Sequence, residues 1–514
     1  MEKQVRKQPD FDAGYAILYL WNLPKGGENV ENSGNLYAAF KAKDARFDGR
    51  FFVGISTTGI YCRPVCTARQ PLQKNCTFYA TAAAAEQAGY RPCLLCRPER
   101  APGTAKVDAA ANLAYRAARL LEENCGAGQS LEEVAVRLGC TARHLRRVFT
   151  EAYHVSPVQY LQTCRLLLAK NLLTDTDLSV LDVAMAAGFG SLRRFNDVFK
   201  KHYRLSPTAL RKQVPEERRH KGDITLALGY RPPYRWEEML NFLAARTIPG
   251  VDAVQGGEYR RTACFTTAGR AHVYGWLQVG HHPQKHALTV TTSESLLPVL
   301  PQVLARVRHL FDLHCDPDAV YETLEGMNDI RPGLCVLGTR LPGSFDAFEM
   351  AVRAVLGQQI TVKAARTLAS RMVEAFGVPV TTGVEGLTHV FPGPQDILAR
   401  EGPIEGHLGP LGVIASRAKT IYELARALAE GELDLGLSAQ PEEEMKKLLA
   451  IRGIGPWTAQ YIAMRAMEWP DAFLETDAGV KKALAPRTQK ELLGMAQAWR
   501  PWRSYATVNL WNSL

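Results

Sequence analysis

The chain has 514 residues, of which 46% are hydrophobic and 22% charged, a globular composition that excludes wholesale disorder. Lys and Arg number 62 against 52 Asp and Glu, so the formal net charge of +10 favours a polyanionic partner. The short apolar stretch at 16–21 cannot span a membrane, and no other stretch comes near the length of a span. We therefore expect a cytoplasmic monomer without a membrane partner.

Changes in composition and periodicity divide the chain into segments at 1–34, 35–103, 104–213, 214–222, 223–315 and 316–514. The first segment has no assigned role, the second holds a cysteine cluster, and the third reads as nearly all helix. The fourth is a charged linker. Strands are expected in the fifth segment at 260–266, 272–279 and 287–292. Helices are expected in the sixth segment at 345–358, 362–376 and 442–450.

Four of the eleven cysteines form two close pairs, Cys62 with Cys66 and Cys93 with Cys96. The spacing is C-x3-C, a gap of 26 residues, and C-x2-C. Two thiolate pairs on either side of a folded excursion are what a tetrahedral four-cysteine Zn²⁺ site requires. The alternative is four unrelated buried thiols.

The segment around these cysteines resembles the N-terminal domain of the Ada adaptive-response regulators, through FDGRFFVGISTTGIYCRPVC and NCTFYATAAAAEQAGYRPCLLCRPE. The resemblance implies that zinc-bound Cys62 accepts a methyl group from a DNA methylphosphotriester and that Arg69 contacts DNA. A thiolate is the form of sulfur that attacks carbon. Methylation would reduce the charge of the site from −2 to −1, so repulsion of DNA phosphates would fall and binding would switch on. The alternative is a purely structural zinc site.

Residues 104–213 contain an internal repeat, in which Val134-Ala135 and Gly139 recur 49 residues later as Val183-Ala184 and Gly188. Each copy predicts an apolar helix, a glycine turn and an arginine-bearing second helix. The helices are expected at 131–138, 141–150, 181–187 and 191–203. Residues 141–221 carry 15 Lys and Arg against 7 Asp and Glu, which favours DNA binding over a bundle with merely solvated charges.

The repeat resembles the AraC-type DNA-binding domain, including Phe189-Gly190-Ser191 and the closing residues 203–207. The resemblance implies that both second helices enter major grooves of promoter DNA, where arginines contact base edges or phosphates. The candidate DNA-binding arginines are Arg143, Arg146, Arg147, Arg193 and Arg194.

A helix, a Gly453-Ile454-Gly455 hairpin and a second helix are predicted over 448–459. Glycines allow the tight hairpin, and amides at the start of the second helix can hold a DNA phosphate. Taken alone, this pattern fits a sequence-blind DNA clamp equally well.

From residue 224 onward the chain resembles the AlkA-type 3-methyladenine DNA glycosylases, through AVRAVLGQQITVKAA, IRGIGPWTAQYIAMRA, FLETD and RPWRSYATVNLW. The resemblance implies that Asp477 is the catalytic carboxylate and that Trp457, Tyr461 and Trp511 line a pocket for a cationic alkylated base. Trp457 fits a place in the pocket or beside the hairpin. Gln359 stands where the residue that intercalates into DNA is usually apolar. Strand-cleaving relatives carry a lysine at the position of Trp457, so monofunctional hydrolysis is expected.

The predicted fold class is multidomain and mainly α with α+β parts. It comprises a small four-cysteine zinc domain, an all-α double helix-turn-helix domain, an α+β antiparallel-sheet subdomain and an all-α helix-hairpin-helix glycosylase domain. The predicted function is methyl-activated transcription regulation combined with excision of alkylated bases in base excision repair. Zn²⁺ is the expected cofactor; alkylated and promoter double-stranded DNA are the expected partners, with RNA polymerase as a further one. The alternative is a transcription regulator whose glycosylase-like half is inactive and only binds DNA.

Overall fold

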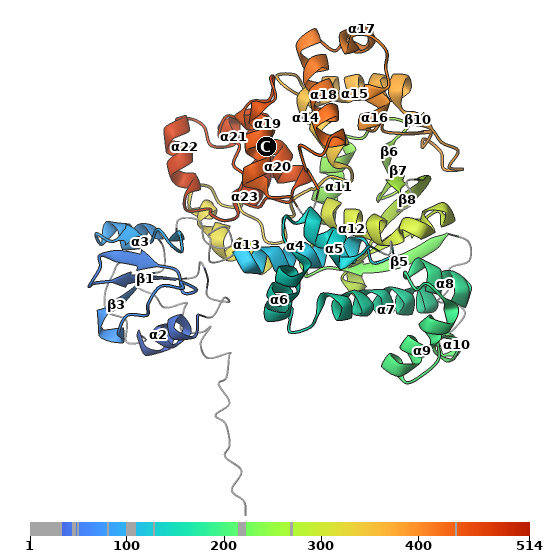
Figure 1. Cartoon of the computed structure of the whole chain (residues 1–514). Coiled ribbons are helices and arrows are strands. Elements are labelled where there is room, and N and C mark those ends of the chain that lie inside the picture. Colours follow the sequence, from blue (N-terminus) through green and yellow to red (C-terminus); the bar gives the residue numbers. More distant parts are fainter. Residues whose placement is uncertain are drawn as a thin grey trace, which may run out of the picture. The chain divides into compact units, whose positions relative to one another are not determined.

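The computed structural model describes residues 33–43, 48, 51–79, 82–98, 109–126, 129–213, 223–267, 271–436 and 439–514. The chain forms two compact units, residues 1–114 and residues 115–514 (Figure 1). Most of the expected N-terminal extension and the whole expected linker, 214–222, lie outside the described residues. No described helix is both long and apolar enough to cross a membrane.

The first unit is built on a four-stranded sheet with the strand order β3-β1-β2-β4. Its elements are α2 (Ser33–Ala42), β1 (Phe52–Ile55), β2 (Ile60–Cys62), β3 (Cys76–Tyr79), α3 (Ala82–Gln87) and β4 (Arg91–Pro92). Alternating side chains cover the two faces of the sheet. Val53 and Phe78 pack with Phe40 of α2, whereas Phe52 and Tyr61 belong to a second cluster with α3. The zinc domain is therefore a sheet between two short helices, which its cysteine spacing did not predict.

The second unit begins with helices that form the repeated pair and its flanks. They are α4 (Ala109–Glu123, its start in the first unit), α5 (Leu131–Arg137), α6 (Ala142–Tyr153), α7 (Pro157–Asp175), α8 (Val180–Ala186), α9 (Leu192–Tyr203) and α10 (Pro207–Lys212). The predicted helices of both repeats are present. Gly139 and Gly188 have positive φ angles of 70° and 78° in the two turns, a conformation that glycine adopts without strain. Thr141 and Ser191 then cap the second helices with their side-chain oxygens.

A five-stranded antiparallel sheet follows, with the order β5-β9-β8-β7-β6. Its strands are β5 (Ile224–Gly229), β6 (Asp252–Gln255), β7 (Glu258–Thr266), β8 (His272–His282) and β9 (Ala287–Thr292), with helices α11 (Trp236–Ala244) and α12 (Leu300–Leu310). The three expected strands correspond to β7, β8 and β9. The α+β subdomain is thus present, and its two further strands are β5 and the short β6.

One hydrophobic core runs from the helix-turn-helix helices into this sheet. Leu166 and Leu172 of α7 are buried in the same cluster as Ile224 and Leu226 of β5, and α7 contacts β5 (Figure 1). The two parts that the expected linker joins are therefore packed together rather than separated.

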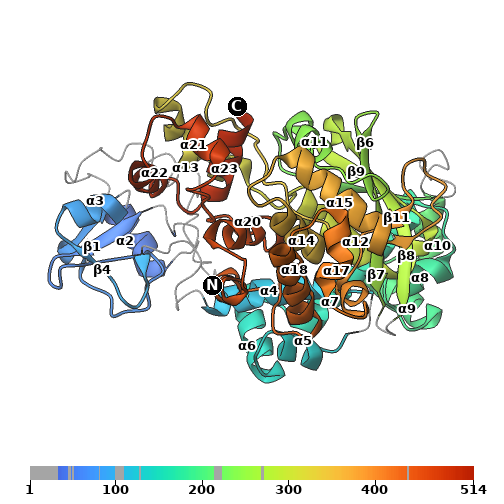
Figure 2. The same ribbon diagram turned by 90° about the horizontal axis from the view of Figure 1, so that it is seen from above.

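The rest of the chain is mostly helical. Its helices are α13 (Pro317–Leu324), α14 (Ala347–Leu356), α15 (Val362–Phe376), α16 (Pro394–Leu398), α17 (Ile404–Leu408), α18 (Ala415–Ala429), α19 (Pro441–Ala450), α20 (Pro456–Ala466), α21 (Ala478–Ala483), α22 (Gln489–Ala496) and α23 (Arg503–Asn512), with the short strands β10 (Val378–Pro379) and β11 (His389–Val390). Helix α14 packs against α18 and α20 (Figures 1 and 2). Of these three helices, α14 and α20 contribute residues that line the pocket described below.

Candidate functional site

The four clustered cysteines come together through strand pairing. Strands β2 and β4 run parallel with Tyr61 opposite Pro92, so Cys62 and Cys93 follow side by side. The Cys93 amide donates to the Tyr61 carbonyl at 3.0 Å. Two tight turns then bring in the second cysteine of each pair, and all four sulfur atoms lie within 4.8 Å of one another.

The cluster has the donor set of a zinc centre. All four cysteines are buried, with exposed fractions between 0% and 8%. Four convergent sulfurs suit a tetrahedral Zn²⁺ with Zn–S distances of about 2.3 Å. Cys62, Cys66, Cys93 and Cys96 are the residues that would hold the ion, as predicted.

Arg63, directly after Cys62, is fully buried and helps to close the cluster. Its backbone amide donates to Cys96 Sγ at 3.4 Å, and its side chain donates to the Cys96 carbonyl and to Asp48. An arginine beside thiolates also offsets their negative charge. The sequence analysis gave Arg63 no role. Arg69, the expected DNA contact, is exposed.

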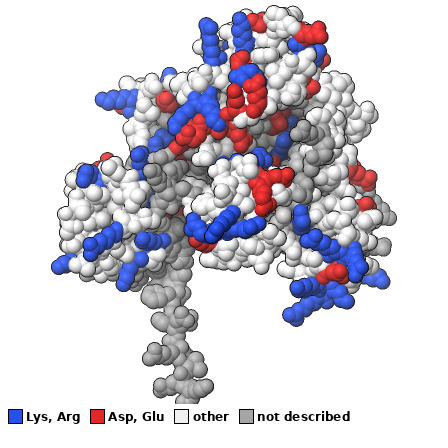
Figure 3. Space-filling model, in the orientation of Figure 1, with Lys and Arg blue, Asp and Glu red and all other residues white. Residues whose placement is uncertain are grey.

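The five candidate arginines of the repeated pair are exposed, three on α6 and two on α9. On α6, Arg146 lies 3.4 Å from Glu132 and Arg147 lies 3.1 Å from Glu151. For Arg143 on α6, and for Arg193 and Arg194 on α9, no ion pair is present among the described residues. Figure 3 shows Lys and Arg gathered over α9 and α10, which matches the expected basic surface.

Only glycine fits the first glycine position of the hairpin between α19 and α20. Gly453 has φ +96°, and an added Cβ would lie 2.2 Å from Thr420 Oγ1. Gly455 caps α20 and an added Cβ there would meet nothing within 4 Å. Open space before the first amides of a helix is suited to an anion.

A cavity of about 400 Å³ opens between α14, α20, α21 and the end of α11. Its lining includes Asp477 and all three predicted aromatic residues, Trp457, Tyr461 and Trp511. A cavity of this size suits a small planar ligand. The structure therefore brings together four residues that the sequence had placed in one site.

Asp477 is both the N-cap of α21 and part of the cavity wall. Its Oδ1 accepts bonds from the Gly479 and Val480 amides, at 2.9 and 3.1 Å, and from Trp511 Nε1 at 2.9 Å. Its Oδ2 accepts a bond from Trp457 Nε1 at 3.2 Å. Four donors thus fix the direction of this carboxylate.

The aromatic side chains form one wall. Trp457 and Tyr461 are stacked, with ring centroids 5.0 Å apart and an interplanar angle of 13°. Tyr461 meets Trp511 edge-on at 6.3 Å, and Trp511 stacks on Phe242. Trp457 therefore belongs to the pocket, because its ring lines the cavity and its indole nitrogen donates to Asp477.

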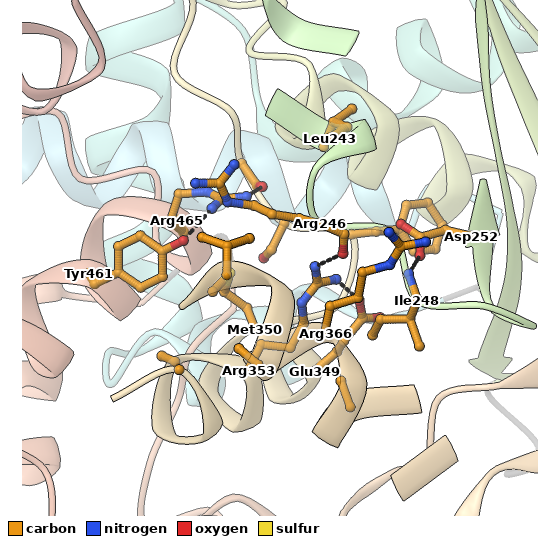
Figure 4. Close-up of a pocket in the computed structure, with 18 of the residues that line it drawn as sticks. Leu243, Arg246, Ile248, Asp252, Glu349, Met350, Arg353, Arg366, Tyr461 and Arg465 are labelled. Atoms are coloured by element: carbon orange, nitrogen blue, oxygen red, sulfur yellow. Dashed lines mark hydrogen bonds and ion pairs between the residues drawn. The ribbon is translucent and has the colours of Figure 1, made fainter. Parts of the chain in front are cut away.

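Sequence reasoning missed the arginines of the pocket. Figure 4 shows Arg465 and Tyr461 at one end of the pocket, Arg246 and Arg353 in the middle, and Asp252 with Ile248 at the other end. Arg465 and Arg353 each follow a pocket residue by four positions on a helix, a spacing that could have indicated them.

Burial and mutual charge tune this group. Burial lowers the pKa of the Arg465 guanidinium to about 10. Burial alone would raise the pKa of Tyr461, but Arg465, Arg246 and Arg353 outweigh it and lower that pKa. Arg465 NH1 donates to the Tyr461 hydroxyl at 2.8 Å, so the ring is held from its polar end.

Gln359 lies in the turn between α14 and α15, exposed and with a positive φ of 53°. Its neighbour Gln358 points inward instead and donates to the Gly453 carbonyl at 2.9 Å and to Thr458 Oγ1 at 3.1 Å. The turn is thereby tied to the hairpin, and Gln359 is the residue that projects from it.

Comparisons with known proteins match separate parts of the chain. Three family models match: the metal binding domain of Ada over residues 35–99, a helix-turn-helix domain over 134–213 and the AlkA N-terminal domain over 225–346.

Individual relatives span one part or nearly the whole chain. The probable bifunctional transcriptional activator/DNA repair enzyme AlkA of Mycobacterium tuberculosis is 37% identical over 93% of this chain and 96% of its own length. The DNA-3-methyladenine glycosylase 2 of Escherichia coli is 36% identical over 55% of this chain and 95% of its own. The bifunctional transcriptional activator/DNA repair enzyme Ada of Escherichia coli is 38% identical over 24% of this chain and 34% of its own. Since the first relative is covered almost completely, the chain belongs to the family of bifunctional transcriptional activator/DNA repair enzymes that join an Ada-type zinc domain and a helix-turn-helix domain to an AlkA-type glycosylase half.

Proposed function

We propose that the chain excises alkylated bases of the 3-methyladenine class from DNA and, separately, accepts a methyl group from DNA methylphosphotriesters to switch on promoter binding. The observation that carries the first activity is the Asp477 carboxylate, held by two indole N–H groups and two backbone amides in the wall of an aromatic cavity. A carboxylate held only as a helix cap would need neither indole.

In the excision step, the bond between the sugar C1′ and the base nitrogen breaks, and the base leaves with the electron pair. The sugar develops positive charge, which a fixed carboxylate in a partly desolvated site stabilises. Asp477 would also orient a water molecule, whose oxygen bonds to C1′ and whose proton passes to solvent. Because an alkylated base is already cationic, it leaves as a neutral molecule and needs little help from a general acid.

The aromatic wall supplies recognition. An electron-poor cationic base stacks favourably on Tyr461 and Trp511, whose ring faces carry negative potential. The lining of the cavity includes no lysine among the described residues, and an amine nucleophile is what strand cleavage requires. These observations support monofunctional hydrolysis of the type found in DNA-3-methyladenine glycosylases II.

The methyl transfer is assigned to Cys62. Zinc, when bound, would keep the four sulfurs as thiolates at neutral pH. The Cys62 sulfur would then bond to the methyl carbon, the bond from that carbon to the phosphotriester oxygen would break, and the oxygen would leave with the electron pair. In the described residues a backbone amide donates to Cys96 Sγ, whereas none donates to Cys62 Sγ. The Cys93 sulfur likewise accepts no backbone amide bond among the described residues, so this difference does not distinguish Cys62 from Cys93, and Cys62 is assigned as the nucleophile by its position in the Ada-type motif.

The transfer removes one negative charge from the zinc domain. Reduced repulsion of phosphates, with Arg69 exposed close to the cluster, would strengthen DNA binding. Promoter recognition is assigned to α6 and α9 through Arg143, Arg146, Arg147, Arg193 and Arg194. Gly453, Gly455 and Gln359 would contact the damaged duplex, and RNA polymerase is proposed as the partner that reads the bound state of a monomeric protein.

The test is a time course on DNA treated with a methylating agent, with substrate in excess. Free 3-methyladenine should accumulate over many turnovers, whereas methyl transfer to protein should stop at one group per chain. Absence of free base would favour the rival function, a regulator whose glycosylase half only binds DNA.

A further inference from the structure

A salt-bridge network connects the first helix of the helix-turn-helix part to the helix that carries the pocket aromatics. Arg119, on α4, is only 7% exposed. Its NH2 nitrogen lies 3.0 Å from both carboxylate oxygens of Glu468. Glu468 stands just beyond the end of α20, in a left-handed conformation with φ 51°. The ion pair therefore joins two parts of the second unit at the point where the pocket helix ends.

Glu468 also holds the His309 ring. His309 Nδ1 lies 2.8 Å from Glu468 Oε1, and its Nε2 lies 3.0 Å from the Arg465 carbonyl oxygen and 3.2 Å from the Ser344 amide. The last carbonyls of a helix have no partner within the helix. His309 thus occupies the end of α20, and Glu468 fixes the ring there.

The Glu468 carboxylate stays ionised in its largely buried position. Burial alone would raise the pKa of Glu468, but Arg119 and His309 outweigh it and hold that pKa well below its usual range. An ionised carboxylate with only 29% of its side chain exposed needs a cation beside it. Arg119 is that cation, and it comes from outside the glycosylase half.

The last turn of α20, which His309 and Glu468 hold, also positions residues that line the pocket. Arg465 donates to the Gly343 carbonyl at 2.9 Å and to the Pro342 carbonyl, and its NH1 holds the Tyr461 hydroxyl. Tyr461 in turn stacks on Trp457, whose indole bonds to Asp477. A shift at the end of α20 would therefore move the base-stacking ring and one of the donors that aim the carboxylate.

We propose that Arg119 is a positioning residue for base excision: through Glu468 and His309 it holds the end of α20, and with it Tyr461, in the excision geometry. The helix-turn-helix part thereby completes the glycosylase site without touching the substrate. This proposal rests on the proposed excision activity.

The experiment measures single-turnover release of 3-methyladenine from methylated DNA by the full-length, zinc-loaded protein. Arg119→Met should lower the rate about 10-fold, since small misplacements in a site cost one to two orders of magnitude. Its affinity for DNA with an abasic analogue should stay within about two-fold. Glu468→Gln should lose at least as much, because it also weakens the contact with His309. The double variant should lose no more than Glu468→Gln alone, because the link to Arg119 is already broken there.

Two variants separate positioning from general damage to the fold. Arg119→Lys should recover most of the rate, because one nitrogen of Arg119 reaches both carboxylate oxygens and an ammonium can replace it. Arg231→Met, which removes a surface pair with Asp316, should release base at the wild-type rate. Thermal unfolding, followed in parallel, should show all variants folded at the assay temperature.

A wild-type rate for Arg119→Met, or additive losses in the double variant, would overturn the positioning role while leaving the excision activity in place. Failure of the wild-type protein itself to release base would overturn the proposed function, and the positioning role with it.

Discussion

The two chemical sites of the molecule are built in opposite ways. The cysteine cluster lies between Cys62 and Cys96, where one pair of parallel strands brings four buried sulfurs together. The base pocket is lined by residues between Leu243 and Trp511 and encloses about 400 Å³. The difference teaches what each reaction requires. The proposed acceptance of one methyl group by a sulfur is compatible with a closed local site, whereas the proposed binding and release of a base needs walls from distant segments.

If the cluster is local and closed, its loss should be the most severe change and should stay within the first unit. Cys93→Ser should abolish binding of the expected single zinc per chain and unfold this domain, because metal binding of about 10–16 kcal/mol in small zinc domains is folding free energy. Metal analysis and limited proteolysis measure both effects. Cys76→Ser is the matched control: burial raises the pKa of the Cys76 thiol to about 11, and Cys76 lies outside the cluster. Zinc retained by Cys93→Ser would contradict the assignment of the ligands.

The pocket should respond to a change of charge without a change of shape. Asp477→Asn keeps one oxygen, which can cap α21 and accept the Trp511 indole bond, although its amide nitrogen cannot accept the bond from Trp457 Nε1. Single-turnover excision should nevertheless fall by about 10²–10³, the usual cost of one preorganised electrostatic group. Affinity for abasic-analogue DNA should change far less.

The matched control for this change is Asp316→Asn, an N-cap aspartate on α13 outside the pocket. It should leave excision unchanged. A wild-type excision rate in Asp477→Asn would show that Asp477 is only a helix cap.

The hairpin glycines sharpen the comparison, because one supports the fold and the other leaves room for DNA. Gly453→Ala forces a positive φ and a contact with the buried Thr420, so the free energy of unfolding of the second unit should fall by about 1–3 kcal/mol. Gly455→Ala should cost at most about 1 kcal/mol in stability but place a methyl group where a phosphate is expected. Denaturant unfolding measures the stability of each variant, and DNA titration measures its affinity for DNA. If both variants lost the same DNA affinity for a given loss of stability, the division between the two glycines would be wrong.

The smallest effects are expected on the two recognition helices. Arg193→Ala should weaken promoter binding and reduce the salt slope by about one unit if the side chain contacts a phosphate. Arg146→Ala should cost less, because Arg146 already pairs with Glu132. Glu132→Gln should slightly strengthen binding by freeing that arginine. Fluorescence titrations at several salt concentrations measure these changes. A larger loss of DNA affinity for Arg146→Ala than for Arg193→Ala would contradict the assignment of Arg193 as the stronger DNA contact.

The local site could be predicted from residue spacing, because four cysteines in two pairs carry the geometry with them. The helix-turn-helix repeat could be predicted equally well, since Gly139 and Gly188 mark the same turn in both copies. The pocket was reached only through a family resemblance, because its walls meet by tertiary packing. No pattern in the sequence indicated that Arg119 of α4 lies against Glu468. The sequence predicted a charged linker between the helix-turn-helix part and the sheet, but it did not predict the shared core that joins them.

The most direct test of two separate chemistries in one chain is to treat DNA with a methylating agent and measure free bases and protein mass in the same samples. The wild-type protein should release 3-methyladenine and gain one methyl group on Cys62. Asp477→Asn should gain the methyl group but release base about 10²–10³ times more slowly, and Cys62→Ser should release base but gain no methyl group. Loss of both activities in either variant, or a methyl group on another cysteine, would contradict the account.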